Sequence, residues 1–202
     1  QFLLYRGMNV GKLSMNFSAS ALTDCTMDLI GKDMVRAATT GLPGTPVASL
    51  THEIMNGARG IGQLWEAGTP LTGTFVKSMS VNIDNNSRGQ KALANLGNVG
   101  IGFGDFDVMG QLEVYFANGT LFDKFLADTY TSLIVATTDV NKNGYVLTMP
   151  RVLLMGAKVV AQGKNQDVMA QFDFQAFSDD AHTNAAYRKT LFLDRVGVAV
   201  TP

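Results

Sequence analysis

Apolar and polar side chains alternate along several stretches of the chain, which is the pattern of β-strands with one buried and one solvated face. Residues 10–32 predict two strands around a turn near Ala19–Ala21. Their core-facing residues are expected to be Leu13, Met15 and Phe17 in the first strand, and Cys25, Met27 and Leu29 in the second. The Cys25 thiol is therefore predicted to be buried.

The same alternation predicts further strands at 74–84, 105–116, 130–138, 145–149, 152–161, 168–177 and about 187–195. The first two of these stretches place the following side chains on the core face: Phe75, Met79, Val81, Ile83, Phe106, Val108, Leu112 and Val114. A hairpin is expected around Asn141–Gly144, because an Asn-Gly pair supplies the positive φ angles of a tight turn.

One segment changes period. Leu121, Phe122, Phe125 and Leu126 form a single helical stripe, with Thr120 or Asn118 as the expected cap. The chain is therefore predicted to be mainly β, an antiparallel β-sandwich or flattened barrel with one short α-helix at about 119–128. We expect one domain over residues 1–202, with an irregular segment at 85–104. A long loop is expected at about 39–73, with a weak strand around Gly62–Glu66.

Composition narrows the function. Only 16% of the residues are charged, the net charge is −1, and Lys and Arg form no cluster. Tight binding of nucleic acid is thus disfavoured. The chain has a single cysteine, which excludes an internal disulfide. No apolar run reaches the roughly 20 residues of a membrane span, so no membrane insertion is expected.

No motif predicts catalysis, a metal or a cofactor. Asp139–Gly144 matches the start of a calcium loop, but Pro150 stands where such a loop needs a bidentate Glu. His52 and Glu53 begin a zinc-protease motif whose second His is replaced by Asn56. The glycines of 97–104 open no helix that could bind a phosphate. We therefore predict that the protein is not an enzyme and has no catalytic, cofactor or metal residues.

Three stretches together resemble the tail tube (major tail) proteins of long-tailed bacteriophages and related gene-transfer particles. They are 82–102 (NIDNNSRGQKALANLGNVGIG), 104–135 (GDFDVMGQLEVYFANGTLFDKFLADTYTSLIV) and 145–177 (YVLTMPRVLLMGAKVVAQGKNQDVMAQFDFQAF). The most recognisable features of the last stretch are Pro150-Arg151 and the turn at 163–167. The likeness is a pattern spread over most of the chain.

The resemblance implies a β-sandwich that forms hexameric rings, which stack into a tube around a tape-measure protein. It also implies contacts with tail tip and terminator proteins, and DNA passing through the lumen without specific binding. The protein would belong to the virion tail and be assembled in the host cytoplasm.

A conduit for DNA should be polar without rows of lysine, because clustered cations would hold the phosphates. Three predicted strands have solvated faces of this kind, carrying five acids and no Lys or Arg. Their candidate lumen-facing residues are Asp24, Thr26, Asp28, Asp107, Gln111, Glu113, Gln171, Asp173 and Gln175. An outward, solvated face explains the same residues.

Contacts between subunits or rings are expected at Trp65, the single tryptophan, and within the segments that carry the resemblance. The remaining candidates are Asp84, Asn85, Arg88, Gln90, Lys164, Asn165 and Asp167. Two other classes stay open: a tube protein of a secretion system or contractile injection particle, and a carbohydrate-binding or adhesin sandwich. The adhesin class is disfavoured because most aromatic residues fall on apolar strand faces.

Overall fold

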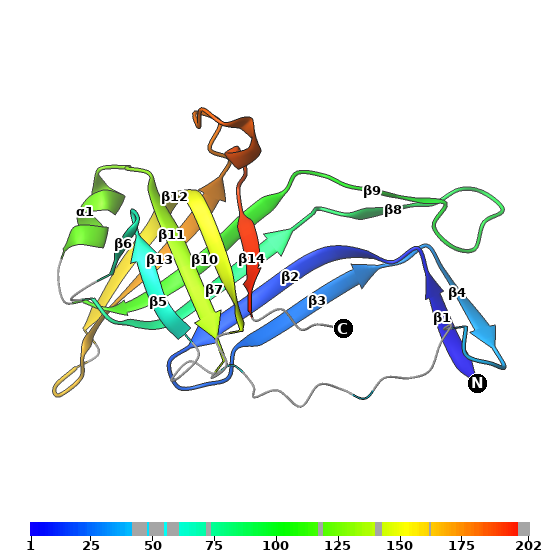
Figure 1. Cartoon of the computed structure of the whole chain (residues 1–202), viewed down its shortest axis with the longest axis horizontal. Coiled ribbons are helices and arrows are strands. Elements are labelled where there is room, and N and C mark those ends of the chain that lie inside the picture. The colour runs from blue at the N-terminus through cyan, green and yellow to red at the C-terminus, as the bar shows by residue number, and fades with distance from the viewer. Residues whose placement is uncertain are drawn as a thin grey trace. The chain divides into compact units, whose positions relative to one another are not determined.

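The structure is a computed structural model that describes residues 1–41, 48, 55, 61–71, 74–116, 119–139, 143–161 and 163–197. The described part is mainly antiparallel β-structure with one α-helix, so the predicted β-sandwich class is confirmed (Figure 1). The strands are β1 (Phe2–Arg6), β2 (Asn9–Ser18), β3 (Asp24–Ile30), β4 (Asp33–Ala37), β5 (Ile61–Glu66), β6 (Thr69–Pro70), β7 (Val76–Asp84), β8 (Arg88–Gln90), β9 (Gly100–Gly102), β10 (Asp107–Tyr115), β11 (Thr131–Thr138), β12 (Gly144–Ala161), β13 (Val168–Phe177) and β14 (Phe192–Val196). The helices are α1 (Thr120–Leu126) and the 3-10 helix η1 (Ala185–Tyr187).

The largest sheet has ten strands, with hydrogen-bonded neighbours in the order β3-β2-β7-β10-β13-β12-β11-β5-β6 and with β14 added beside β12. Two small sheets pair β1 with β4 and β8 with β9. The chain divides into two compact units. Unit 1 comprises Gln1–Ser14, Thr26–His52 and Ile83–Asp107, and unit 2 comprises Met15–Cys25, Glu53–Asn82 and Val108–Pro202. The single-domain arrangement stays a prediction.

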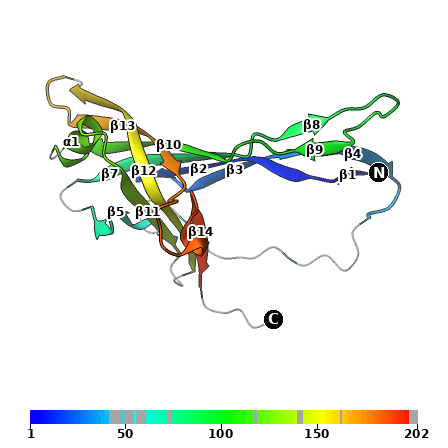
Figure 2. The ribbon, with the colours of Figure 1, turned by 90° about the horizontal axis from the view of Figure 1, so that it is seen from above.

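Unit 2 contains a hydrophobic core between two layers of strands. Strands β5 and β11 run at a steep angle to β7, β10 and β13 (Figures 1 and 2). Alternate residues of these strands are buried, as the period-two pattern predicted. The most completely buried side chains are Phe172, Leu112, Leu133, Met149, Val81, Val108, Val114 and Val152.

The long strand β12 belongs to both layers. Its first half pairs with β11 up to Val152, and its second half pairs with β13 from Arg151 onward. Pro150 lies at this change of partner, beside a register shift in β11, where the missing N–H of proline interrupts the ladder least. The Arg151 guanidinium lies 4.0 Å from the centre of the Tyr130 ring, which it covers as a cation–π contact. The two strands predicted at 145–149 and 152–161 are thus one.

Helix α1 contacts β12 and buries Leu121. Its N-cap is Gly119, which makes no side-chain cap hydrogen bond, so the expected capping by Thr120 is wrong. Asn118 lies outside the described residues. Lys124 binds the buried Glu66 of β5, which also accepts a hydrogen bond from Thr131 of β11. The helix is therefore fixed to unit 2 by a partly buried ion pair as well as by apolar packing.

Unit 1 is built differently, because Ile83 is the only buried apolar side chain among its described residues. Besides parts of β2, β3 and β7, which belong to the ten-stranded sheet, unit 1 contains two short two-stranded sheets, β1 with β4 and β8 with β9. Twelve large apolar side chains of unit 1 are exposed: Phe2, Leu3, Tyr5, Met8, Met27, Leu29, Met34, Leu93, Leu96, Val99, Phe103 and Phe106. Its described part therefore has no core of its own.

Several core assignments at strand ends and on β3 are wrong. Phe75 and Phe106 are exposed rather than core-facing, because each precedes the first paired residue of its strand. Cys25, Met27 and Leu29 are also exposed, since no element covers β3 among the described residues of this single chain. The prediction of a buried Cys25 thiol is therefore incorrect. Phe17, Met79, Val81, Ile83, Val108, Leu112 and Val114 are buried as expected.

The predicted hairpin between β11 and β12 is present, but Gly144 does not supply the positive φ angle that was predicted. Gly144 is not among the glycines of positive φ; it pairs with Thr138, and a Cβ there would lie 1.9 Å from the Thr137 carbonyl oxygen. Close approach of the backbone therefore requires this glycine. The weak strand expected at Gly62–Glu66 is β5, whereas most of the 39–60 loop lies outside the described residues. The segment 85–104 contains β8 and β9, which were not predicted.

Candidate functional site

A polar face lies on the side of β7, β10, β13 and the second half of β12 that is turned away from the core of unit 2. On β10 the buried Val108, Leu112 and Val114 alternate with Met109, Gln111 and Glu113. On β13 the buried Phe172 and Phe174 alternate with Gln171, Asp173 and Gln175. We call the outward residues of these four strands the polar face.

Strand register places the candidate lumen residues of β10 and β13 directly opposite one another. Gln111 lies opposite Asp173, and Glu113 lies opposite Gln171. The Gln111 Nε2 atom donates a hydrogen bond of 2.7 Å to Asp173 Oδ1. Five candidates from two separate stretches of sequence thus form one continuous surface: Gln111, Glu113, Gln171, Asp173 and Gln175.

Glu113 is held by two groups of the neighbouring strand β7. The Lys77 Nζ atom donates to Glu113 Oε1 at 2.9 Å, and the Ser78 hydroxyl donates to Glu113 Oε2 at 3.0 Å. The hydrogen bond from Lys77 is the main reason why the pKa of Glu113 lies below its usual value; burial opposes this shift, and the Ser78 hydrogen bond and the charge of Lys77 add to it. Glu113 is therefore ionised at neutral pH.

The polar face is mixed in charge rather than purely acidic. Lys77 is bound to Glu113, and Lys158 of β12 lies opposite Gln171. Strands β10 and β13 carry no Lys or Arg on this face, as their sequences predicted. The neighbouring strands β7 and β12 supply the two lysines. Only the tertiary pairing shows this partial neutralisation.

A shallow hollow in the polar face is lined by Ser80, Asn82, Met109, Gln111, Met155 and Asp173. Its walls are amide, hydroxyl, thioether and carboxylate groups. Within the described ranges, no group of three His, Cys, Asp or Glu residues could hold a metal ion. No helix in the described part of the chain is long and apolar enough to cross a membrane.

The other four candidate lumen residues lie outside the paired register of β10 and β13. Asp107 begins β10 and accepts a 2.8 Å hydrogen bond from the Asn86 side chain. Asp24, Thr26 and Asp28 are exposed on β3, which divides between the units: Asp24 belongs to unit 2, and the other two belong to unit 1. By alternation with the buried Val108, Asp107 shares the outward side of β10 with Gln111 and Glu113, whereas the three residues on β3 are not part of the register between β10 and β13.

The candidate contact residues also fall into two groups. In unit 1, Asp84 forms a 2.8 Å ion pair with Lys12, which lowers the pKa of Asp84 and raises that of Lys12 through their shared hydrogen bond. The Asn85 side chain donates to the Val10 carbonyl oxygen at 2.9 Å, and Arg88 and Gln90 are exposed on β8.

In unit 2, Trp65 is half-buried on β5, and the exposed Lys164, Asn165 and Asp167 follow β12. Their role in contacts stays a prediction.

Sequence reasoning missed the exposed apolar residues of β1 and β4, including Tyr5 and Met34. The signal was present, since Phe2–Tyr5 is an apolar run without polar alternation next to the chain start. Such a run predicts burial, but it does not say whether the cover comes from the same chain.

A comparison with family models places these observations in context. No curated protein matches the chain. The model described as "Phage tail tube protein" matches residues 1–176, which include both units' strands up to the end of β13. This chain therefore belongs to the phage tail tube protein family and has a structural role in the tail tube.

Proposed function

We propose that copies of this chain form hexameric rings that stack into a hollow tube, and that the polar face lines its lumen. The tube would surround a tape-measure protein before ejection and let DNA pass afterwards. Its ends would meet the tail tip and terminator proteins, and assembly would take place in the host cytoplasm. The observation that carries the proposal is the continuous polar face of β10 and β13.

The width of such a conduit is physically reasonable. If six copies each contribute the four strands of the polar face, a closed barrel of twenty-four strands results. With strands about 4.8 Å apart and tilted by about 40°, its circumference is ~150 Å and its backbone diameter ~48 Å. Inward side chains narrow this opening but leave room for duplex DNA.

The chemistry of the face suits passage rather than binding. Glu113 and Lys77 neutralise each other, and Gln111 satisfies one oxygen of Asp173. Amides and paired charges hydrate well, and Glu113 and Asp173 balance Lys77 and Lys158, so the face offers no excess of cations to the phosphates. A sliding polymer would therefore meet a wet surface without strong local attachment.

Helical reconstruction by electron cryomicroscopy of tubes grown from the purified protein tests the assembly and the lining together. We expect Gln111, Asp173 and Gln175 to face the lumen. Rings of another symmetry, or these side chains on the outer surface, would refute the corresponding part of the proposal.

DNA passage is tested separately with Gln175→Lys, which would add one lysine per copy to the lumen. Virions with this variant should assemble tails of normal length but eject DNA more slowly, because each ring would gain a belt of cations. The matched control is Thr183→Lys, which adds the same charge at an exposed turn. Equal ejection rates for both variants would argue against a lumenal position of Gln175.

A further inference from the structure

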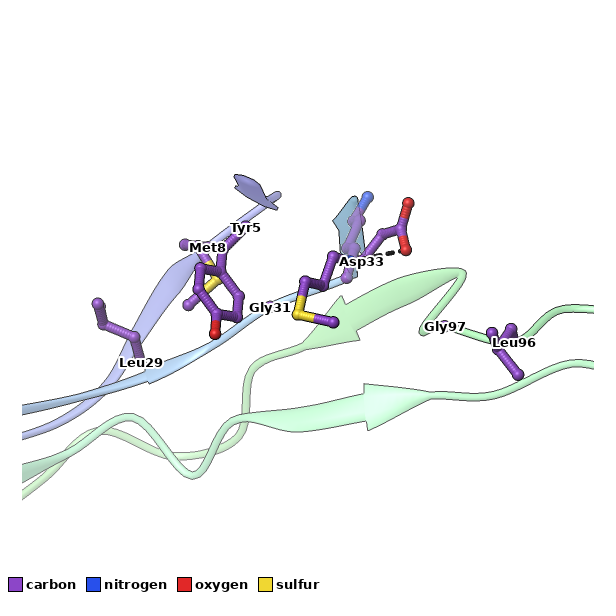
Figure 3. A pocket seen from close by; sticks show the side chains of 9 residues that line it. Tyr5, Met8, Leu29, Gly31, Asp33, Leu96 and Gly97 are labelled. Carbon is purple, nitrogen blue, oxygen red and sulfur yellow. Dashed lines mark hydrogen bonds between the residues drawn. The ribbon is translucent and has the colours of Figure 1, made fainter. Parts of the chain in front are cut away.

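Unit 1 contains an apolar groove that the proposed lumen leaves unexplained. It is lined by Tyr5, Met8, Leu29, Met34 and Leu96, with Lys32 and Asp33 at its side. In the view of Figure 3 Tyr5 overlaps Met8, and Leu96 lies apart from them on the segment between β8 and β9. The side chains of Tyr5, Leu29 and Met34 are each more than half exposed, and that of Leu96 is fully exposed.

The groove is held in shape by backbone and side-chain hydrogen bonds that join three separate segments of unit 1. The Asn98 N–H donates to the Lys32 carbonyl oxygen at 2.8 Å, and the Asn98 side chain donates to the Gly31 carbonyl oxygen at 2.9 Å. The Lys32 N–H in turn donates to the Arg6 carbonyl oxygen at 3.0 Å. A surface fixed in this way loses little conformational freedom when it binds a partner.

A single glycine permits the closest of these approaches. A Cβ at Gly97 would lie 2.4 Å from the Lys32 carbonyl oxygen, so the segment before β9 could not come this near with any other residue. Leu96, the residue before it, is thereby presented outward with nothing of the described chain against it. An exposed leucine on a fixed backbone is typical of an interaction surface.

We propose that this groove is a docking site for a second copy of the same chain, which covers Tyr5, Met34 and Leu96 in the assembled tube. The inference rests on the proposed self-assembly. Unit 1 has one buried apolar residue among those described, and two-stranded sheets are marginal in water by themselves. It therefore needs external cover, and in a tube built from this chain the partner present at every position is another copy.

The charges at the groove agree with this occupant. Lys32 and Asp33 carry opposite signs, so the groove has no net charge that would repel an identical surface. A strongly acidic or basic partner would find no complementary field there. The apolar side chains supply the affinity, and the two charges can fix the orientation of the partner.

The first test is the double variant Tyr5→Gln/Leu96→Gln, measured as the lowest protein concentration at which tubes grow. Both side chains are exposed, so the monomer should fold normally and retain its circular dichroism spectrum. We expect the threshold to rise about 10-fold or more, because two apolar contacts are lost per interface. The matched control Leu126→Gln changes an equally apolar, exposed residue of unit 2 and should shift it by less than about 2-fold.

The second test identifies the occupant. Tyr5 is replaced by the photo-cross-linker p-benzoylphenylalanine, and tubes formed by this variant are irradiated. A product of twice the monomer mass that appears in tubes and not in dilute monomer supports the proposal. Cross-links only within one chain, or only to another tail protein in intact virions, would overturn it.

These results separate the two proposals. If the wild-type protein forms no tubes under any condition, the proposed assembly fails. If wild-type tubes form and the double variant forms them at the same concentration, the assembly stands and the groove proposal fails.

Discussion

Units 1 and 2 use their apolar residues in opposite ways. In unit 2 the strands alternate buried and exposed positions, and buried side chains such as Val81, Leu112 and Phe172 close a core between two layers. In unit 1 only Ile83 is buried among the described residues, whereas twelve large apolar side chains are exposed. The comparison teaches that unit 2 buries its apolar side chains within one chain, whereas unit 1 leaves its own exposed and available for contact with other chains.

The largest expected effect comes from the core of unit 2. Phe172→Ala should lower the free energy of unfolding by about 3–5 kcal/mol, because Phe172 is 1% exposed and its removal leaves a cavity. Urea denaturation of dilute, unassembled protein measures it. The counterpart Leu96→Ala in unit 1 should change the same quantity by less than about 0.5 kcal/mol. Similar losses for both variants would break the distinction between the units.

A smaller effect is expected at Gly110 of β10, which lies between β7 and β13 in the sheet. A Cβ at Gly110 would lie 2.2 Å from the Ser80 carbonyl oxygen and 2.4 Å from Phe174 Cζ. Gly110→Ala should therefore destabilise unit 2 by about 1–3 kcal/mol through overpacking. Gly119→Ala is the control, because its Cβ would meet nothing closer than 3.6 Å. Equal stability of the two variants in urea would show that the sheet adapts freely there.

The ion pair at helix α1 gives the next smaller effect. Lys124→Met leaves the buried Glu66 carboxylate with the Thr131 hydroxyl as its remaining partner from this cluster. We expect a loss of about 1–2 kcal/mol, below the value for a fully buried pair because Lys124 is 26% exposed. Thermal unfolding measures it, with Lys158→Met as the exposed control. If Lys124→Met unfolds at the wild-type temperature, the pair does not anchor the helix.

The smallest effect concerns the polar face and acid. Because Lys77 and Ser78 lower the pKa of Glu113 in the folded protein, its contribution to stability is present above the usual carboxyl pKa of about 4.3. That contribution is lost as the pH falls through the lower folded pKa. Glu113→Gln should therefore reduce the acid dependence of the unfolding free energy below about pH 5, by a few tenths of a kcal/mol at this solvated site. An unchanged pH profile would contradict the proposed pairing.

The alternation of residues was sufficient to predict much of unit 2. Strand β13 was predicted with its observed bounds, 168–177, and the core positions Val108, Leu112 and Val114 followed from the period of two. The same rule failed for Cys25, Met27 and Leu29, because alternation shows which residues share a face but not whether anything covers that face. It also failed at Phe75 and Phe106, where the strand begins one residue later.

The candidate site was predicted only in parts. Gln111, Glu113, Gln171, Asp173 and Gln175 were selected from separate strands, and the register then placed them side by side. The lysines that join them, Lys77 and Lys158, come from β7 and β12 and could not be assigned to this face without the pairing of those strands. The groove of unit 1 was not predicted, because hydrogen bonds between segments more than sixty residues apart hold it together.

By itself, the sequence determined the class of protein: a β-rich, lightly charged chain whose spread of matching residues points to a phage tail tube. Local rules suffice for the β-rich class, since side-chain alternation and turn residues act over a few positions, whereas the tail tube family follows from the resemblance alone. The tertiary structure alone decided which strands are neighbours, that β12 serves two layers, and that unit 1 has no described core. These properties depend on pairings between distant segments, which no local pattern encodes.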